Sequence, residues 1–264
     1  MHAVDRTITV LARMGYAARG FVYLVVGLLS WNAAVDVDDA ADVREALQTI
    51  FEQQFGVPVL VALAAGLIGY AVWRSVQSLL DVDRHGWSLR GSSVRLGLIV
   101  SALVHAGLAW ACVEIAFRIG SGEGRPVRDQ VQSIMSLPQG DWLIMGLGVA
   151  VLIAGVAHIY KGATGGFRKW FEASAAMMRW IDPVSRFGLI SRGLIFLIVG
   201  GFLLYAGIYV EPEAARGMEG ALNWLQDQYA GRWMLGVVSV GLLAFGGYSI
   251  IESVVRRIGV AHAL

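Results

Sequence analysis

The stretch GYAARGFVYLVVG, Gly15 to Gly27, opens the first long apolar run of the chain. A helix needs about 20 mainly apolar residues to cross about 30 Å of hydrocarbon, and this run continues to Val35. Arg19 lies near its start, although a charge inside a bilayer is costly. The stretch therefore predicts a membrane-spanning helix whose arginine needs an explanation.

The composition favours a membrane protein over the whole chain. Of 264 residues, 56% are hydrophobic and 16% are charged, and the mean hydropathy is +0.61, which is more apolar than a soluble domain of this size. The net charge of +1 gives no reason to expect a nucleic-acid partner. Cys112 is the single cysteine, which excludes an internal disulfide and a cysteine metal cluster.

Six runs are long enough to cross a bilayer as helices. Lysines and arginines concentrate at the side of these runs that carries both termini, so the positive-inside rule predicts cytoplasmic termini. We expect the first run to be retained rather than cleaved as a signal peptide, because its pattern recurs later. The predicted spans are Ala17 to Val35, Val59 to Leu80, Val94 to Phe117, Trp142 to Ala163, Phe187 to Val210 and Trp233 to Val255.

The odd-numbered spans repeat one pattern without a gap when Arg13 is aligned with Arg95 and Arg186. Every seventh position is then small in all three copies, and an intermediate position holds Tyr23, His105 or Phe196. This spacing is typical of a helix-packing seam. The aligned small residues are Gly15, Gly97 and Gly188; Gly20, Ala102 and Gly193; Gly27, Ala109 and Gly200; Ala34, Ala116 and Gly207.

A short amphipathic segment follows each odd span, starting at Val43, Val127 and Met218. Its apolar residues recur at helical spacing, and it is too polar to span, so we expect it at the outer interface. The repeated unit is span, interfacial helix, span, over about 13–81, 90–165 and 184–257. The predicted fold is an all-α integral membrane protein of six transmembrane helices, three two-helix repeats about a pseudo-threefold axis.

Several motifs resemble a known family. GYAARGFVYLVVG, GLIGYAVWRSVQSLLDVDRHG, AHIYKGATGGFRKWF and GLLAFGGYSIIESVVRR are similar to the domain of unknown function 1206 family, bacterial integral membrane proteins of three two-span repeats. The resemblance implies a bacterial inner-membrane location, and it implies no activity, cofactor or catalytic residue. The second repeat departs from the pattern at Ser101, where its neighbours have Arg19 and Arg192.

Arg19 and its equivalent Arg192 allow three interpretations. Each side chain can snorkel to the headgroups from the cytoplasmic end of its span. One of them can pair with Glu252, at the cytoplasmic end of the last span, and so fix helix register. Together they can hold a lipid phosphate or another anion near the helix starts.

His105 and Tyr23 are the polar candidates near mid-depth on the seam. His105 differs in depth from His158 by roughly 10 Å at 1.5 Å per residue, so the two histidines cannot share a metal. We expect a satisfied histidine, bonded to Tyr23. The sequence predicts no metal site and no cofactor.

The segment FRKWFEASAAMMRWI, 167–181, is predicted to form a basic amphipathic helix. Aromatic anchors on one face and basic residues off that face suit the anionic cytoplasmic leaflet, with docking of a protein partner as the alternative. The residues that carry this prediction are Arg168, Lys169, Trp170, Phe171 and Arg179.

These patterns favour a non-enzymatic structural, interaction or lipid-binding protein. A small ion or solute channel or transporter that uses the pseudo-threefold centre is the alternative, although the seam carries no charged ring. An enzyme is not expected, because the chain contains no phosphate loop, nucleophile triad or acid and base pair.

Overall fold

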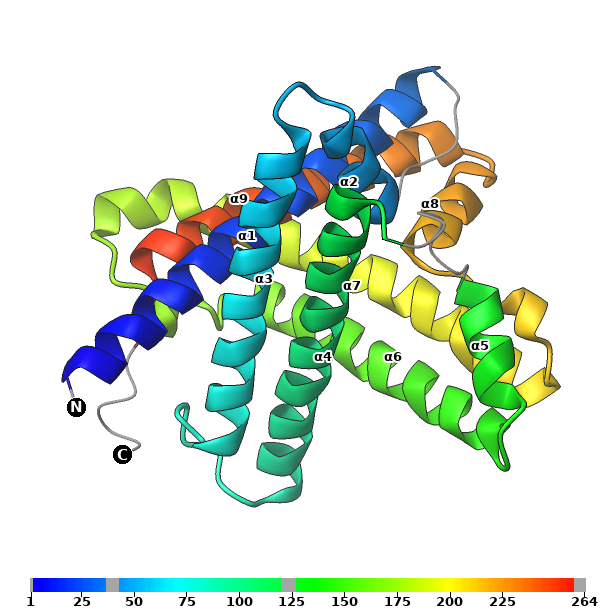
Figure 1. Ribbon diagram of the computed structural model, residues 1–264, viewed down its shortest axis with the longest axis horizontal. Coiled ribbons are helices and arrows are strands. Elements are labelled where there is room, and N and C mark those ends of the chain that lie inside the picture. The colour runs from blue at the N-terminus through cyan, green and yellow to red at the C-terminus, as the bar shows by residue number, and fades with distance from the viewer. Residues whose placement is uncertain (1, 37–42, 120–126, 259–264) are drawn as a thin grey trace.

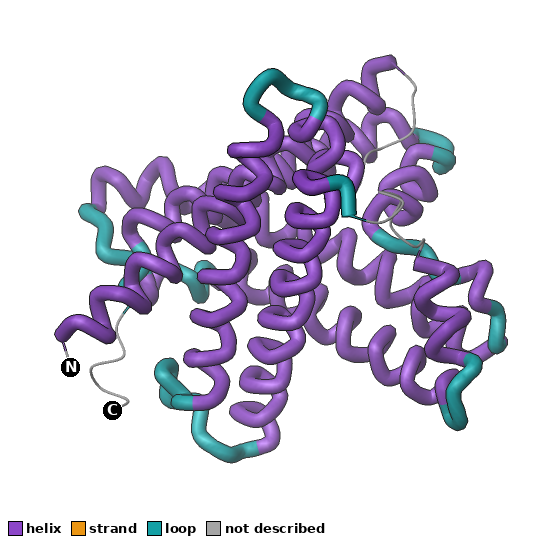
Figure 2. Tube along the Cα trace, in the orientation of Figure 1, coloured by secondary structure: helices purple, strands orange, loops and turns teal. Residues whose placement is uncertain are grey.

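The computed structural model describes residues 2–36, 43–119 and 127–258. Apart from one antiparallel bridge between Phe171 and Arg256, the described residues form only helices and their connections, and Figure 2 shows the loops confined to the helix ends. The elements are α1 (His2–Asp36), α2 (Val43–Phe51), α3 (Gly56–Leu79), α4 (Leu89–Phe117), α5 (Val127–Met135), α6 (Gly140–Thr164), η1 (Arg168–Trp170), α7 (Ala175–Tyr209), η2 (Pro212–Ala214), α8 (Met218–Gln226) and α9 (Gly231–Val255).

Six of these helices, α1, α3, α4, α6, α7 and α9, are long and apolar enough to cross a membrane, as predicted. All six begin earlier than the predicted starts, and α1 and α7 begin more than ten residues earlier. α1 starts at His2, because its first turns carry Ile8 and Ala12 onto an aromatic cluster around Tyr16. α7 starts at Ala175, where the Ser174 side chain accepts a hydrogen bond from the Met177 backbone N–H at 3.3 Å, a standard N-cap.

The short helices α2, α5 and α8 are nine residues each and begin where the repeat predicted. Each presents an apolar face to the spans, and α2 for example buries Ala46, Leu47 and Ile50. A glycine then starts the even span of each repeat, at Gly56, Gly140 and Gly231. The predicted unit of span, short amphipathic helix and span is therefore confirmed.

The spans associate as three closely packed pairs, α1 with α9, α3 with α4, and α6 with α7. Figure 1 shows these pairs crossing one another near the middle of the molecule rather than running as one parallel bundle. Each odd span thus packs on the even span of another repeat, in cyclic order.

Glycines of the predicted seam make the closest approaches between paired helices. A Cβ atom on Gly20 would lie 2.8 Å from the Gly246 carbonyl oxygen, and one on Gly193 would lie 2.8 Å from that of Gly155. Small residues let helix backbones approach in this way. In the second repeat Gly97 would meet nothing within 4 Å, while the seam residues Ala102, Ala109 and Ala116 are buried, so the close glycine contacts belong to the first and third repeats.

The three aligned arginines make equivalent hydrogen bonds, one arginine in each helix pair. Arg13 donates to the Ser253 and Val254 carbonyls at 3.2 and 2.8 Å. Arg95 donates to those of Ser78 and Leu79 at 2.7 and 3.3 Å, and Arg186 to those of Gly162, at 3.1 Å, and Ala163. The last carbonyls of a helix lack intrahelical partners, so each arginine caps the even span beside it.

The second repeat breaks the regularity. α1 packs on α3 and α7 packs on α9, whereas α4 and α6 share no comparable contact among the described residues. These two spans also bury the smallest share of their apolar windows, 28% and 17%, against 44% or more for the others. A single pseudo-threefold axis therefore stays a prediction, and the molecule has an open side between α4 and α6.

Candidate functional site

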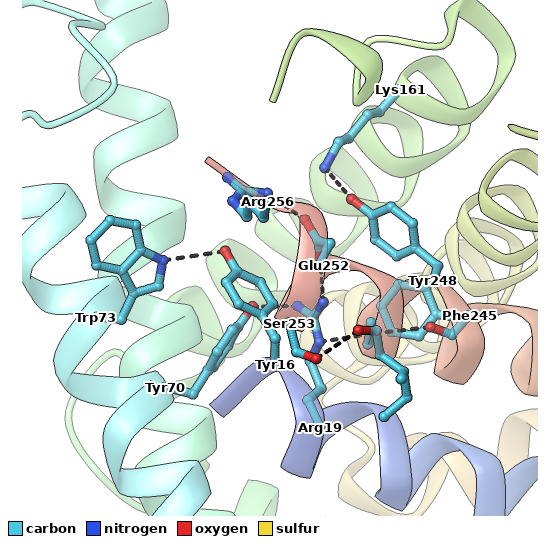
Figure 3. Close-up of polar contacts among 12 residues, drawn as sticks. Tyr16, Arg19, Tyr70, Trp73, Lys161, Phe245, Tyr248, Glu252, Ser253 and Arg256 are labelled. Atoms are coloured by element: carbon cyan, nitrogen blue, oxygen red, sulfur yellow. Dashed lines mark hydrogen bonds and ion pairs between the residues drawn. The ribbon is translucent and has the colours of Figure 1, made fainter. Parts of the chain in front are cut away.

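The centre of the molecule contains a buried ionic cluster where the helix pairs cross. Arg19 Nη2 of α1 lies 2.6 Å from Glu252 Oε2 of α9, and Arg256 Nη1 bonds the other carboxylate oxygen. Arg19 is 5% exposed and Glu252 is 1% exposed. Figure 3 shows Glu252 between the two guanidiniums, so the structure brings Arg19 and Glu252 together.

Arg19 uses its remaining donors on the same cluster. Its Nε donates to Ser249 Oγ at 3.1 Å, and its Nη1 donates to the Tyr70 hydroxyl. The guanidinium carbon also lies 4.9 Å from the Tyr70 ring centre and 5.2 Å from that of Phe245. With these partners and this burial, the side chain is not extended toward a headgroup layer.

α3 contributes a second arginine that the sequence did not single out. Arg74 Nη2 also donates to the Tyr70 hydroxyl, and Nη1 donates to Gln77 Oε1 at 2.9 Å. Gln77 Nε2 in turn donates to Asp83 Oδ2 at 3.0 Å. Tyr70 therefore accepts from two cations, Arg19 and Arg74.

Arg192 lies beside this network and is held differently. Its guanidinium carbon is 4.7 Å from the Tyr23 ring centre, 4.8 Å from that of Phe196 and 4.4 Å from that of Phe245. The side chain is 8% exposed, and its buried Nε has no hydrogen-bond partner. Within the described part of the chain, no carboxylate pairs with it.

The charges of the cluster do not balance. Four guanidiniums, on Arg19, Arg74, Arg192 and Arg256, remain protonated at any physiological pH. Among the described residues, Glu252 is the carboxylate that forms ion pairs in this cluster, and its partners are Arg19 and Arg256. Unmatched charge away from water costs several kcal/mol per ion as an order of magnitude. The arrangement can therefore attract and hold an anion.

The mid-depth candidates are placed differently from the prediction. His105 Nδ1 lies 2.7 Å from the Ser101 carbonyl oxygen, and its ring centre lies 4.5 Å from that of Tyr70. Tyr23 instead packs against Phe245 at 4.9 Å and lies under Arg192. The predicted bond between His105 and Tyr23 is wrong, because the preceding helical turn already satisfies the histidine. The described residues contain no group of three or more metal-ligating side chains.

The predicted helix over 167–181 is also wrong. The segment forms the short turn η1, then an extended stretch that bridges Phe171 to Arg256, and α7 begins only at Ala175. Phe167 and Phe171 are 0% and 8% exposed, because both rings pack on Tyr248. Phe167 and Phe171, which suggested a membrane-facing surface, therefore cover the cluster beside the C-terminal end of α9.

The basic residues of the same segment lie outside this cover. Arg168 pairs with Asp182 at 2.6 Å, and Arg179 and Lys169 are exposed. Trp170 is half-buried, with its ring centre 5.6 Å from the Arg256 guanidinium carbon. The residues predicted to share one membrane-surface helix are thus separated in the structure: Phe171 is buried in the core, and Lys169 and Arg179 are exposed on the surface.

The turn after α3 is ordered by Asp81. Asp81 accepts hydrogen bonds from the Gly86 and His85 backbone N–H groups at 2.7 and 2.8 Å. Those two bonds favour the ionised form and lower the pKa of the Asp81 carboxyl. Asp81 is therefore a loop cap.

Sequence reasoning missed Arg74, Arg256, Lys161 and Tyr248 as members of the cluster. Lys161 Nζ donates to the Tyr248 hydroxyl at 2.8 Å. A signal was present in the repeat alignment, because Gln77, Lys161 and Glu252 are equivalent positions of the three even spans. All three positions are polar inside apolar helices, which by default marks a functional centre.

Comparison with known proteins agrees with this architecture. The model of a family described as Domain of Unknown Function (DUF1206) matches once in each repeat, over residues 14–81, 96–165 and 187–256. An uncharacterized protein of Bacillus subtilis (strain 168), YxxB, is 31% identical over 248 residues, which cover 93% of this chain and 90% of that protein. No solved structure matches the chain.

Proposed function

This chain belongs to the DUF1206 family, and we propose that it is a non-enzymatic membrane protein that binds an anionic ligand at its central cluster. One observation carries the proposal: the buried guanidiniums of Arg19, Arg192 and Arg256 and the half-buried one of Arg74 gather in one cluster, in which the described residues supply a single ion-pairing carboxylate, Glu252. Anionic lipid headgroups are the ligands we expect first, since basic sites between membrane helices bind them. We place the protein in the bacterial plasma membrane with both termini cytoplasmic, following the positive-inside rule.

The centre supports binding better than conduction. Val26 and Ser30 of α1 and Cys112 of α4 are each 0% exposed, and they follow the ionic cluster toward the outer ends of their helices. Side chains packed this tightly support a closed centre among the described residues, whereas conduction requires a continuous open path. Ion flux through reconstituted liposomes would favour the channel alternative instead.

The cytoplasmic surface offers a weaker, peripheral contact with anionic lipid. Lys169 and Arg179 are exposed, and Trp180 is 81% exposed. Tryptophan and basic residues together suit the headgroup layer. A protein partner at this surface would use the same residues, so their substitution separates surface contact from binding at the centre.

The test measures stabilisation of the delipidated protein in neutral detergent by added anions. Phosphatidylglycerol or sodium phosphate at about 100 times its Kd should stabilise the folded protein by about 2.7 kcal/mol. We expect the Arg19→Ala, Arg192→Ala double variant to lose this response. The Arg168→Ala, Arg179→Ala double variant removes two exposed cytoplasmic charges and is the control. A wild-type protein that responds to neither anion would contradict the proposal.

A further inference from the structure

Among the described residues, Arg192 has no counterion, whereas its repeat equivalent Arg19 pairs with Glu252. Helices α6 and α9 are both 25 residues long and start at Gly140 and Gly231, so a shift of 91 residues relates them. Arg19 packs against α9 and bonds Ser249 and Glu252. Arg192 belongs to the helix that packs against α6, where the equivalent positions hold His158 and Lys161.

The rings around Arg192 restrict how a ligand can reach it. The ring centres of Tyr23, Phe196 and Phe245 lie within 4.8 Å of the guanidinium carbon. Aromatic contact stabilises the cation but supplies no negative charge and no in-plane acceptor. The Nε donor remains unbonded although it is buried. A phosphate oxygen would satisfy such an in-plane donor, because guanidinium and phosphate geometries match.

The cytoplasmic approach to this level is covered. Glu172 N–H donates to the Val255 carbonyl at 2.8 Å, and Arg257 N–H donates to that of Trp170 at 2.8 Å. These main-chain bonds tie the connection before α7 to the end of α9. Beneath them lie the buried rings of Phe167 and Phe171. A ligand entering from the cytoplasm would have to break this cover.

The side between α4 and α6 is open at the same level. In the other repeats Tyr70 and Phe245 pack against Gly15 and Gly188, whereas the equivalent position on α6 is Ala154. Across from it, Gly97 meets nothing within 4 Å. Val104 is 55% exposed, while its equivalent Val22 on α1 is 2% exposed. The missing ring at Ala154 and the exposed Val104 therefore leave an apolar gap between α4 and α6 that faces the bilayer.

We infer that an anionic phospholipid enters this gap from the bilayer and places its phosphate on Arg192, with acyl chains along α4 and α6. This inference rests on the proposed function and adds the ligand class, the binding residue and the route. Charge complementarity selects an anionic headgroup, and the apolar flanks at Val104 and Ala154 select a molecule with chains. A free anion would gain no binding free energy from contact with the apolar gap.

The test is native mass spectrometry of delipidated protein titrated with palmitoyl-oleoyl phosphatidylglycerol, with phosphatidylcholine as the neutral lipid. Arg192→Gln removes the charge and Ala154→Phe restores a ring in the gap. Arg192→Gln should weaken phosphatidylglycerol binding at least about tenfold through loss of a charge-assisted contact, and Ala154→Phe should weaken it by a similar factor because its ring occupies the space of the acyl chains. The matched controls are Arg84→Gln, in the turn after α3 and outside both proposed lipid contacts, and Val149→Phe on α6, both at exposed positions, and both should bind like the wild type.

Three results would overturn the inference. If Ala154→Phe binds normally while Arg192→Gln does not, the route is wrong but anion binding stands. If phosphatidylglycerol binds equally to wild type and Arg192→Gln, the residue is wrong. If sodium phosphate raises the Tm of the wild type and phosphatidylglycerol does not bind, the ligand is a free anion, which leaves the proposed function intact. Ala154→Phe keeps Arg192 in place, so the test does not depend on one variant folding.

Discussion

Replacing Glu252 by glutamine should destabilise the protein strongly. Glu252 is 1% exposed and bonds Arg19 through one oxygen and Arg256 through the other. Glutamine keeps the shape and one acceptor, but its NH₂ group would point donors at a guanidinium. Removing one member of a buried ion pair costs about 3 to 5 kcal/mol. The retained hydrogen bond offsets about 1 kcal/mol, so we expect a net loss of about 2 to 4 kcal/mol.

The assay is equilibrium unfolding in mixed micelles, followed by tryptophan fluorescence. The matched control is Glu172→Gln, which makes the same substitution in an exposed carboxylate that pairs with Arg257 at 2.9 Å. Exposed pairs contribute about 0 to 1 kcal/mol. If Glu252→Gln is no more destabilising than Glu172→Gln, the central ion pair does not hold the helices and the reasoning fails.

A double-mutant cycle resolves which arginine depends on Glu252. Arg19→Gln and Glu252→Gln should be non-additive, with a coupling of about 0.5 to 3 kcal/mol, because the two residues are in contact. Arg192→Gln should couple more weakly, since Arg192 has no bond to this carboxylate in the described structure. Equal coupling for both arginines would mean that they share Glu252.

Three further predictions test the framework around the cluster. Cysteines at the equivalent positions of the short helices should react with an impermeant reagent added outside intact cells, in a Cys112→Ser background; labelling only from the cytoplasm would invert the topology. Gly27→Leu should destabilise by about 1 to 3 kcal/mol through overpacking, while Gly201→Leu, where a side chain meets nothing within 4 Å, should be tolerated; equal thermal stability would place the seam against lipid. Arg95→Gln should lower the Tm, because it removes the cap on the Ser78 and Leu79 carbonyls, whereas the exposed Arg84→Gln should not; similar Tm values would contradict the capping role. The labelling positions are Gln48, Gln132 and Asn223.

The repeat and the spans could be predicted from the sequence because they depend on local, periodic features. Small residues at every seventh position mark a packing face, and Gly20 and Gly193 lie in such a face. The segment 167–181 was misjudged because helical spacing of aromatic residues does not distinguish a lipid-facing surface from a core-facing one. Phe171 is buried by Tyr248, which lies 77 residues further along the chain, and no local pattern contains that contact.

The central cluster was harder to predict because its members come from different repeats. Arg19 was recognised as unusual, but its partners Tyr70 and Ser249 lie on two other helices. Each odd span packs against the even span of another repeat. The spacing of residues along the chain does not determine which even span that is. The alignment of the polar residues Gln77, Lys161 and Glu252 indicated a common polar position in the even spans. It could not be assigned to one cluster until the pairing of the helices was known.

The cyclic pairing also explains why the repeats cannot be identical at their centre. Equivalent residues of the three repeats converge on one buried region, so three copies of Arg19 or of Glu252 would place like charges together in a medium where charge is poorly screened. Substitution of Ser101 for the second arginine and of Gln77 and Lys161 for the acidic position avoids that repulsion. The same substitutions leave Arg192 beside α6, which has Lys161 in place of a carboxylate at the position equivalent to Glu252. The sequence differences between the repeats thus stabilise the interface of α1 with α9, where Arg19 pairs with Glu252. At the interface of α7 with α6 the same differences leave Arg192 with an unmatched charge, to which an anion would bind.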